Sequence, residues 1–137
     1  MAAERPVLTE GQIIAEGGWH PRYARVLAVA SDGDFGFALV DGNGDGAELE
    51  DEIWLFGAGS WSGGPTSGAG PLSQVGTLRS WWPAKDVCVA YGSAPGRQSV
   101  TISLAAQRHD VPVGRYGIWA FVKVVTGAHD CDGPELG

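Results

Sequence analysis

The feature that most constrains the fold is the run Gly117–Val125, which reads Gly-Ile-Trp-Ala-Phe-Val-Lys-Val-Val. Eight of its nine positions carry no charge. In an extended strand Trp119 and Phe121 share one face, while the other face carries Ile118, Ala120, Val122 and Val124. A strand that is apolar on both faces is covered on both sides. The run therefore predicts a central, fully buried strand.

The rest of the chain also favours β structure. Ser99–Leu104 alternates hydroxyl and aliphatic side chains, which is typical of a half-buried strand. The 22 glycines and 8 prolines disfavour long helices. Turn signals separate short apolar segments at intervals of roughly 8–12 residues. We expect one all-β domain of 137 residues, an antiparallel sandwich or a partly open barrel with one short N-terminal helix.

The chain divides into four stretches. Residues 9–56 predict a short helix over Glu10–Glu16, introduced by the capping box Thr9 to Gln12, and then a three-stranded meander. Its strands are expected at Tyr23–Ala30, Phe35–Val40 and Glu50–Phe56, with Phe35, Phe37 and Leu39 on one face of the second. Residues 57–76 are rich in Gly and Ser and predict a long loop. Residues 87–125 predict antiparallel strands at Val87–Tyr91, Ser99–Leu104, Asp110–Val113 and Gly117–Val125, and residues 126–137 a flexible tail.

The stretch 87–125 resembles a bacterial immunoglobulin-like module. The resemblance is carried by the turn Gly92-Ser93-Ala94-Pro95-Gly96 before an alternating strand, and by the Gly-x-Trp-x-Phe pattern of Gly117, Trp119 and Phe121. The chain as a whole is similar to uncharacterised small β-rich proteins of high-GC bacteria. These resemblances imply a β-sandwich and carry no activity.

Charge and cysteine usage limit the partners. The net charge is −7, and the acids concentrate in residues 41–52, which contain no base. A chain without a basic face is not expected to bind nucleic acid. It shows no secretory signal and no apolar run long enough to cross a membrane. We therefore expect a cytoplasmic protein in which Cys88 and Cys131 are free thiols that contribute nothing to stability. The alternative is a processed, secreted form in which the two cysteines pair.

The acidic segment 41–52 fits the calcium-loop pattern D-x-[DN]-x-[DN]-G-x₅-E. Its candidate ligands for Ca²⁺ are the side chains of Asp41, Asn43, Asp45 and Glu52 and the carbonyl of Ala47. Glu48 and Leu49 depart from the pattern, and the flanking segments predict strands where an EF-hand has helices. The alternative is a solvated acidic turn between two strands.

The six tryptophans raise a second question. Trp54 and Trp119 fall inside predicted strands and are expected in the core. Trp19, Trp61, Trp81 and Trp82 lie at or near loops, where exposed rings can form a surface for a ligand or partner, and Trp61, Trp81 and Trp82 are the candidates for it. The alternative is that these rings close the ends of the sandwich.

No motif for nucleophilic catalysis, phosphate binding or zinc hydrolysis is present: G-x-S-x-G, G-x-x-x-x-G-K-[ST] and H-E-x-x-H are all missing. The leading hypothesis is a non-catalytic binding or interaction domain for a protein or small molecule, without a cofactor. A homodimer formed through edge strands is one form that such an interaction can take. A calcium-binding β-domain is the first alternative, and an enzyme without a recognisable motif is the second.

Overall fold

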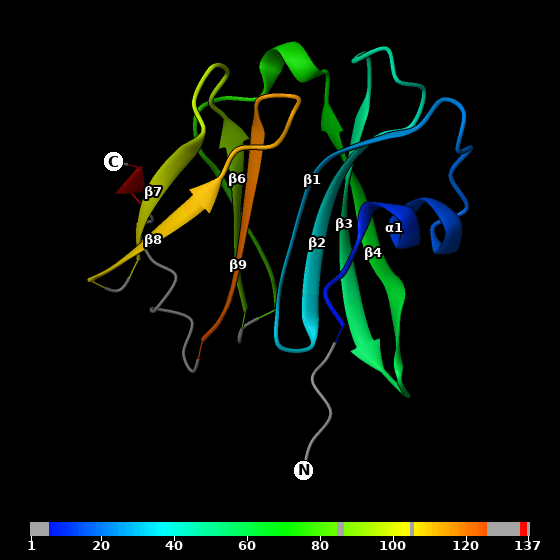
Figure 1. Ribbon diagram of the computed structural model, residues 1–137, viewed down its shortest axis with the longest axis horizontal. Helices are drawn as coiled ribbons and strands as arrows, with labels where there is room; N and C mark the ends of the chain where they lie inside the picture. The colour runs from blue at the N-terminus through cyan, green and yellow to red at the C-terminus, as the bar shows by residue number, and fades with distance from the viewer. Residues whose placement is uncertain (1–5, 85–86, 105, 126–134, 137) are drawn as a thin grey trace.

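The computed structural model describes residues 6–84, 87–104, 106–125 and 135–136, with the backbone alone at residues 65 and 80–84. It is an all-β, antiparallel, sandwich-like domain with one short helix, and its sheets do not close into a barrel. The predicted fold class is therefore confirmed. Figure 1 shows the layers side by side along the longest axis, from β7 and β8 at one end to α1 at the other.

The strands form three sheets. The N-terminal sheet has the order β1-β2-β3-β4, the middle sheet β5-β6-β9 and the outer sheet β10-β7-β8. The elements are α1 (Glu10–Glu16), β1 (Arg25–Asp32), β2 (Phe35–Asp41), β3 (Leu49–Gly57), β4 (Ser60–Gly70), the 3₁₀ turn η1 (Leu72–Gln74), β5 (Arg79–Ala84), β6 (Val87–Ser93), β7 (Ser99–Leu104), β8 (Gln107–Pro112), β9 (Ile118–Val124) and β10 (Glu135–Leu136). No helix among the described residues is long and apolar enough to span a membrane.

Three apolar clusters hold these layers together. The first lies between the N-terminal and middle sheets and includes Phe37, Leu39 and Tyr91. The second lies between the middle and outer sheets and includes Ile102 and Trp119. The third lies between α1 and the outward face of the N-terminal sheet. Because side chains alternate along each strand, the N-terminal sheet and the middle sheet each contribute apolar residues to two clusters, one on each face.

β9 shows this alternation most clearly. Ile118, Ala120 and Val122 belong to the first cluster, while Trp119 and Phe121 belong to the second. Both faces are therefore covered. In the hydrogen-bonding order, however, β6 is the central strand of its sheet and β9 lies at its edge. The expectation of a central strand was wrong in this respect, because burial of both faces does not determine the number of neighbours within a sheet.

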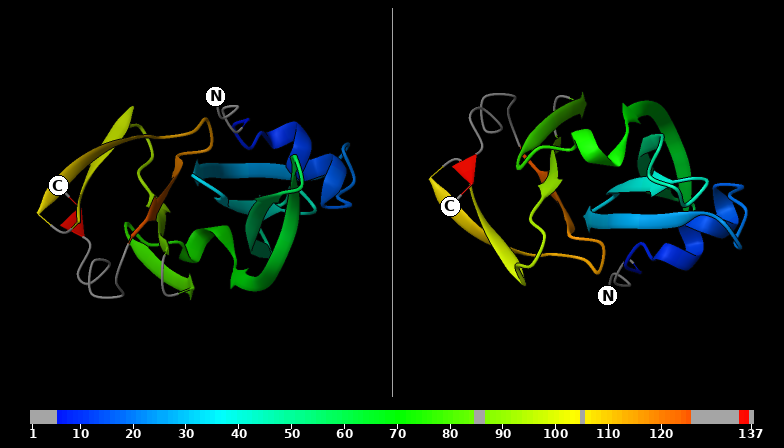
Figure 2. Two further views of the ribbon diagram at one scale, coloured as in Figure 1. Left: turned by 90° about the horizontal axis from the view of Figure 1, so that it is seen from below. Right: turned by 90° about the horizontal axis from the view of Figure 1, so that it is seen from above.

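The N-terminal and middle sheets meet at one side. β1 lies beside β9, as both views of Figure 2 show, and the Val124 amide donates to the Asp32 carboxylate at 2.8 Å. On the other side, the connection through η1 crosses from β4 to β5. Leu72 and Val75 of this connection pack against the first cluster. β1 therefore lies between β2, its partner in the N-terminal sheet, and β9 of the middle sheet.

The predicted loop 57–76 is instead mostly a strand. β4 pairs along its length with β3, from Gly57 opposite Ser60 to Leu49 opposite Gly70. Ala58 and Gly59 both have positive φ, 52° and 84°, which matches the two-residue turn of a tight hairpin. The glycine content argues against a strand by propensity, but pairing with β3 overrides that preference.

The cysteines also differ from expectation. Cys88 of β6 is fully buried and is disulfide-bonded, not a free thiol. The sequence has one other cysteine, Cys131, which lies outside the described residues. Most of the predicted tail 126–137 also lies outside them, but residues 135–136 pair with β7 as β10. Disulfides persist mainly in oxidising compartments, whereas free thiols were expected for a cytoplasmic chain.

Candidate functional site

The candidate site begins with α1, whose position is fixed at both ends. The Thr9 hydroxyl accepts a hydrogen bond from the Gln12 amide at 3.2 Å and caps the first turn. Gly17 ends the helix, and its amide donates to the Ile13 carbonyl at 2.9 Å. Ile13 is fully buried in the third cluster, so the helix lies flat on the N-terminal sheet. Ile14 and Ala15 lie toward the adjacent groove.

Trp19 follows the helix and is held on two sides. Its indole nitrogen donates to the Glu52 carboxylate at 3.2 Å. Its ring lies so close to Gly42 that an added Cβ there would come within 2.6 Å of the Trp19 Cζ3 atom. Any larger residue at position 42 would therefore displace the ring. These contacts fix the position of the Trp19 ring, which forms one wall of the adjacent groove.

Glu52 is a buried carboxylate that holds two tryptophans. One oxygen accepts from Trp19 and the other from the Trp54 indole, each at 3.2 Å. Burial raises the pKa of Glu52 above its ordinary value, and the nearby charge of Glu50 acts in the same direction. The two indole donors oppose this shift by stabilising the charged form. Glu52 thus acts as a structural acceptor beneath the site.

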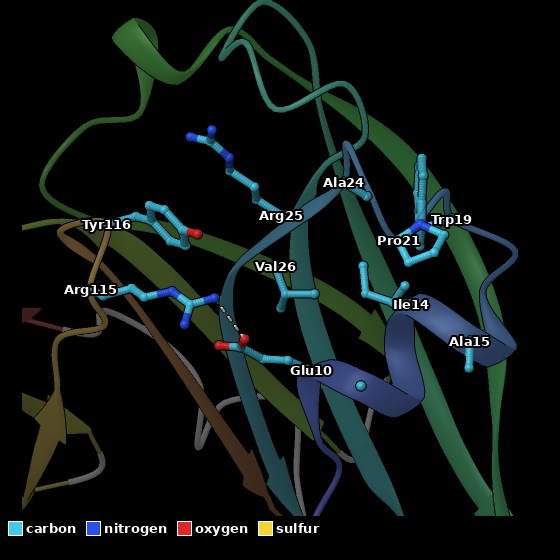
Figure 3. Close-up of a pocket in the computed structure, with 11 residues that line it drawn as sticks. Glu10, Ile14, Ala15, Trp19, Pro21, Ala24, Arg25, Val26, Arg115 and Tyr116 are labelled. Atoms are coloured by element: carbon cyan, nitrogen blue, oxygen red, sulfur yellow. Dashed lines mark hydrogen bonds and ion pairs between the residues drawn. The ribbon is translucent and has the colours of Figure 1, made fainter.

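The opposite wall is the β8–β9 turn. The Gly117 amide donates to the Gly114 carbonyl at 3.0 Å, and the Gly114 amide donates to the Ile118 carbonyl at 2.9 Å. Gly117 has a φ of +76°, a conformation that suits glycine. The turn presents Arg115 and Tyr116 toward α1, as Figure 3 shows.

Between these walls lies a groove of about 670 Å³, which we call the α1 groove. Figure 3 shows its two ends, with Arg115 and Tyr116 at one and Trp19 and Pro21 at the other. Val26 of β1 lies between them. The groove is lined by Glu10, Gly11, Ile14, Ala15, Trp19, Pro21, Ala24, Arg25, Val26, Arg115 and Tyr116.

One end of the groove is cationic and aromatic. The Arg115 guanidinium lies 5.0 Å from the centre of the Tyr116 ring, and the Arg25 guanidinium lies 5.9 Å from it. Arg115 also forms an ion pair with Glu10, with 3.2 Å between Nη2 and Oε2. Contact with Tyr116, followed by the charge of Glu10, raises the pKa of Arg115. The Arg115 guanidinium therefore remains charged at any physiological pH.

The other end is mainly apolar, since Ile14, Ala15 and Pro21 line it beside the Trp19 ring. Beyond Trp19 a smaller hollow of about 270 Å³ is lined by Trp19, His20, Gly42, Asn43, Glu48 and Glu50. Trp19 separates this acidic hollow from the α1 groove.

The predicted calcium ligands do not converge. The Asp41 carboxylate accepts from the Gly44 and Gly46 amides at 3.0 and 2.8 Å, and Asp45 accepts from the Ala47 amide at 3.0 Å. Asn43 is exposed beside the acidic hollow, and β3 carries Glu52 onto the indoles. No group of three or more His, Cys, Asp or Glu side chains in the described ranges is placed to hold a metal. The carboxylates of Asp41 and Asp45 accept hydrogen bonds from backbone amides of the same segment, which is the arrangement expected of an acidic turn.

Of the predicted tryptophan surface, the structure places the side chain of Trp61 alone. Trp61 is buried, its indole donates to the Pro6 carbonyl at 2.8 Å, and its ring meets Phe56 edge-on at 5.3 Å. Because it packs under the N-terminal segment, Trp61 offers no surface to a ligand. Trp81 and Trp82 belong to β5, and their side chains are outside the described part of the structure.

Sequence reasoning singles out Trp19 as a loop tryptophan but misses the other residues that form the α1 groove. Arg115 and Tyr116 fall between two predicted strands and Arg25 falls within one, and none of the three belongs to a predicted site. Glu10 and Arg115 are 105 positions apart. No local pattern reveals that the β8–β9 turn lies against α1. The cluster of aromatic and basic residues between Trp19 and Arg25 was the one available signal.

The described residues that line the α1 groove include no histidine, cysteine or serine, and Glu10 is the one carboxylate among them. The chain matches no protein-family model, no curated protein and no solved structure.

Proposed function

We propose that this protein is a non-catalytic binding domain and that the α1 groove is its ligand site. One observation carries the proposal: a single groove contains two guanidinium groups beside the Tyr116 ring at one end and an apolar wall at the other. Ligand sites are typically concave and mostly apolar, with a few placed polar groups that fix orientation. The ligand that fits is elongated, with an anionic end and an apolar body.

Charge distribution supports an anionic ligand. The chain has a net charge of −7, so a general electrostatic attraction for anions is missing. Arg25 and Arg115 nevertheless both line the groove. Their guanidinium groups lie 5.9 and 5.0 Å from the centre of the Tyr116 ring, so two positive charges flank this ring.

The apolar wall supports an amphipathic ligand. Ile14 and Trp19 are only partly buried, although they pack at the margin of the third cluster. A ligand that covers them removes apolar surface from water, at about 25 cal/mol for each Å².

The test is a titration of ¹⁵N-labelled protein with decyl sulfate below its micelle concentration, followed by NMR. We expect saturable shifts at the amides of α1, Trp19 and the β8–β9 turn, and weaker binding by Arg25→Ala. Arg108→Ala is the matched control, because it removes the same charge from β8 in the outer sheet. Absence of saturable binding, or shifts scattered over the surface, would contradict the proposal.

A further inference from the structure

The Glu10 carboxylate occupies the cationic end of the α1 groove. Its Oε2 atom lies 3.2 Å from Arg115 Nη2. The two residues come from the start of α1 and from the β8–β9 turn, so their contact bridges the groove, as the dashed line in Figure 3 shows. The position suited to the charged end of a ligand therefore already contains a carboxylate.

This contact is weak enough to be exchanged. The Arg115 and Glu10 side chains are 67% and 48% exposed. Ion pairs at such exposure contribute little to stability, because water and salt screen them and two long side chains must be ordered. Glu10 is not needed as the helix cap either, since Thr9 has that role.

A ligand carboxylate at the same place would bring contacts that Glu10 lacks, because the body attached to it extends along the groove. A ligand body extending toward Val26 and Ile14 would cover apolar surface. Glu10 is tethered to the helix and provides no such contact.

We infer that the α1 groove takes a carboxylate attached to an apolar body and that Glu10 is its built-in competitor, displaced from Arg115 when the ligand binds. The inference rests on the proposed function. It names the head group as a carboxylate, whether the end of an alkyl chain or the C-terminus of an apolar peptide. It also assigns Glu10 the role of setting the affinity.

The test measures binding of decanoate by calorimetry to the parent, Glu10→Gln and Glu16→Gln. Glu10→Gln should bind decanoate about two- to fivefold more tightly, as expected from removing one exposed carboxylate–arginine contact. Glu16→Gln should match the parent, because Glu16 is exposed at the other end of α1 and does not line the groove. Decanol should bind the parent and Glu10→Gln equally.

A second arm separates the two sources of the carboxylate. An N-acetylated apolar tripeptide is compared with its C-terminally amidated form, and preference for the free acid over decanoate identifies a peptide terminus. If the parent binds decanoate and Glu10→Gln binds it no better, the competitor role is wrong while the groove remains a binding site. If neither protein binds decanoate, the tripeptide or decyl sulfate, the proposed function fails as well.

Discussion

Glu52 shows how one residue can serve the fold at an electrostatic cost. It is 5% exposed, and its oxygens are taken up by the indoles of Trp19 and Trp54. Neither donor carries a charge that would offset the desolvation of a carboxylate. Burial therefore dominates, and the pKa of Glu52 rises above its ordinary value of 4.5.

The raised pKa predicts a pH-dependent effect of Glu52→Gln. The folded protein holds this proton more tightly than the unfolded chain does. The contribution of Glu52 to stability is therefore fully present below pH 4.5 and is lost as pH rises through the folded-state pKa. Thermal melts from pH 4 to 8 should show the variant gaining stability relative to the parent. Glu16→Gln is the control, and a parent–variant difference that stays constant across this range would refute the cause given.

Trp119 supports a second prediction at this scale. It is fully buried in the second cluster, and its indole nitrogen has no hydrogen-bond partner among the residues that the structure describes. Trp119→Ala should reduce the free energy of unfolding by about 3–5 kcal/mol, as for other large aromatics removed from a core. Trp119→Phe keeps most of the apolar volume and removes the unpaired donor, so it should be much milder. Urea unfolding measures both variants. If the two substitutions reduce the free energy of unfolding equally, packing of the ring is not the main contribution of Trp119.

At the scale of elements, the connection between β2 and β3 contains most of the acidic segment, and whether it binds calcium can be tested. Its carboxylates accept hydrogen bonds from its own amides, and Glu52 is engaged elsewhere. Millimolar calcium should therefore raise the melting temperature no more than magnesium at the same concentration. A rise specific to calcium that Asp41→Ala abolishes would restore the calcium-binding alternative.

The elements that could be predicted are those with a strong local signal. The helix has the predicted range, Glu10–Glu16, because its capping residues and the following glycines are local. The faces of β2 and β9 follow from alternation. β4 could not be predicted in this way, since its small residues carry little periodic signal and it becomes a strand by pairing with β3. The α1 groove was hidden for a different reason, because Glu10 and Arg115 are far apart in the sequence and meet only through the tertiary fold.

At the scale of the molecule, the disulfide of Cys88 is tied to the central strand of the middle sheet. A disulfide stabilises mainly by restricting the unfolded chain, typically by about 2–4 kcal/mol. A reductant should therefore lower the melting temperature by several degrees, contrary to the behaviour of free thiols. Cys88→Ala is the control, because its melting temperature should not respond to the reductant. No response in the parent would show that the bond does not contribute to stability.

The middle sheet has a consequence for how the chain can be divided. Its side chains alternate between two apolar clusters, and the first of these takes residues from both the N-terminal and the middle sheet. A fragment ending after β4 would leave Phe37 and Leu39 facing water, and a fragment beginning at β5 would leave Ile118 and Val122 in the same position. Each fragment would keep one of the other two clusters but would expose its half of the first. A recombination event that cut the chain between β4 and β5 would therefore give two pieces that each present an apolar sheet face to water.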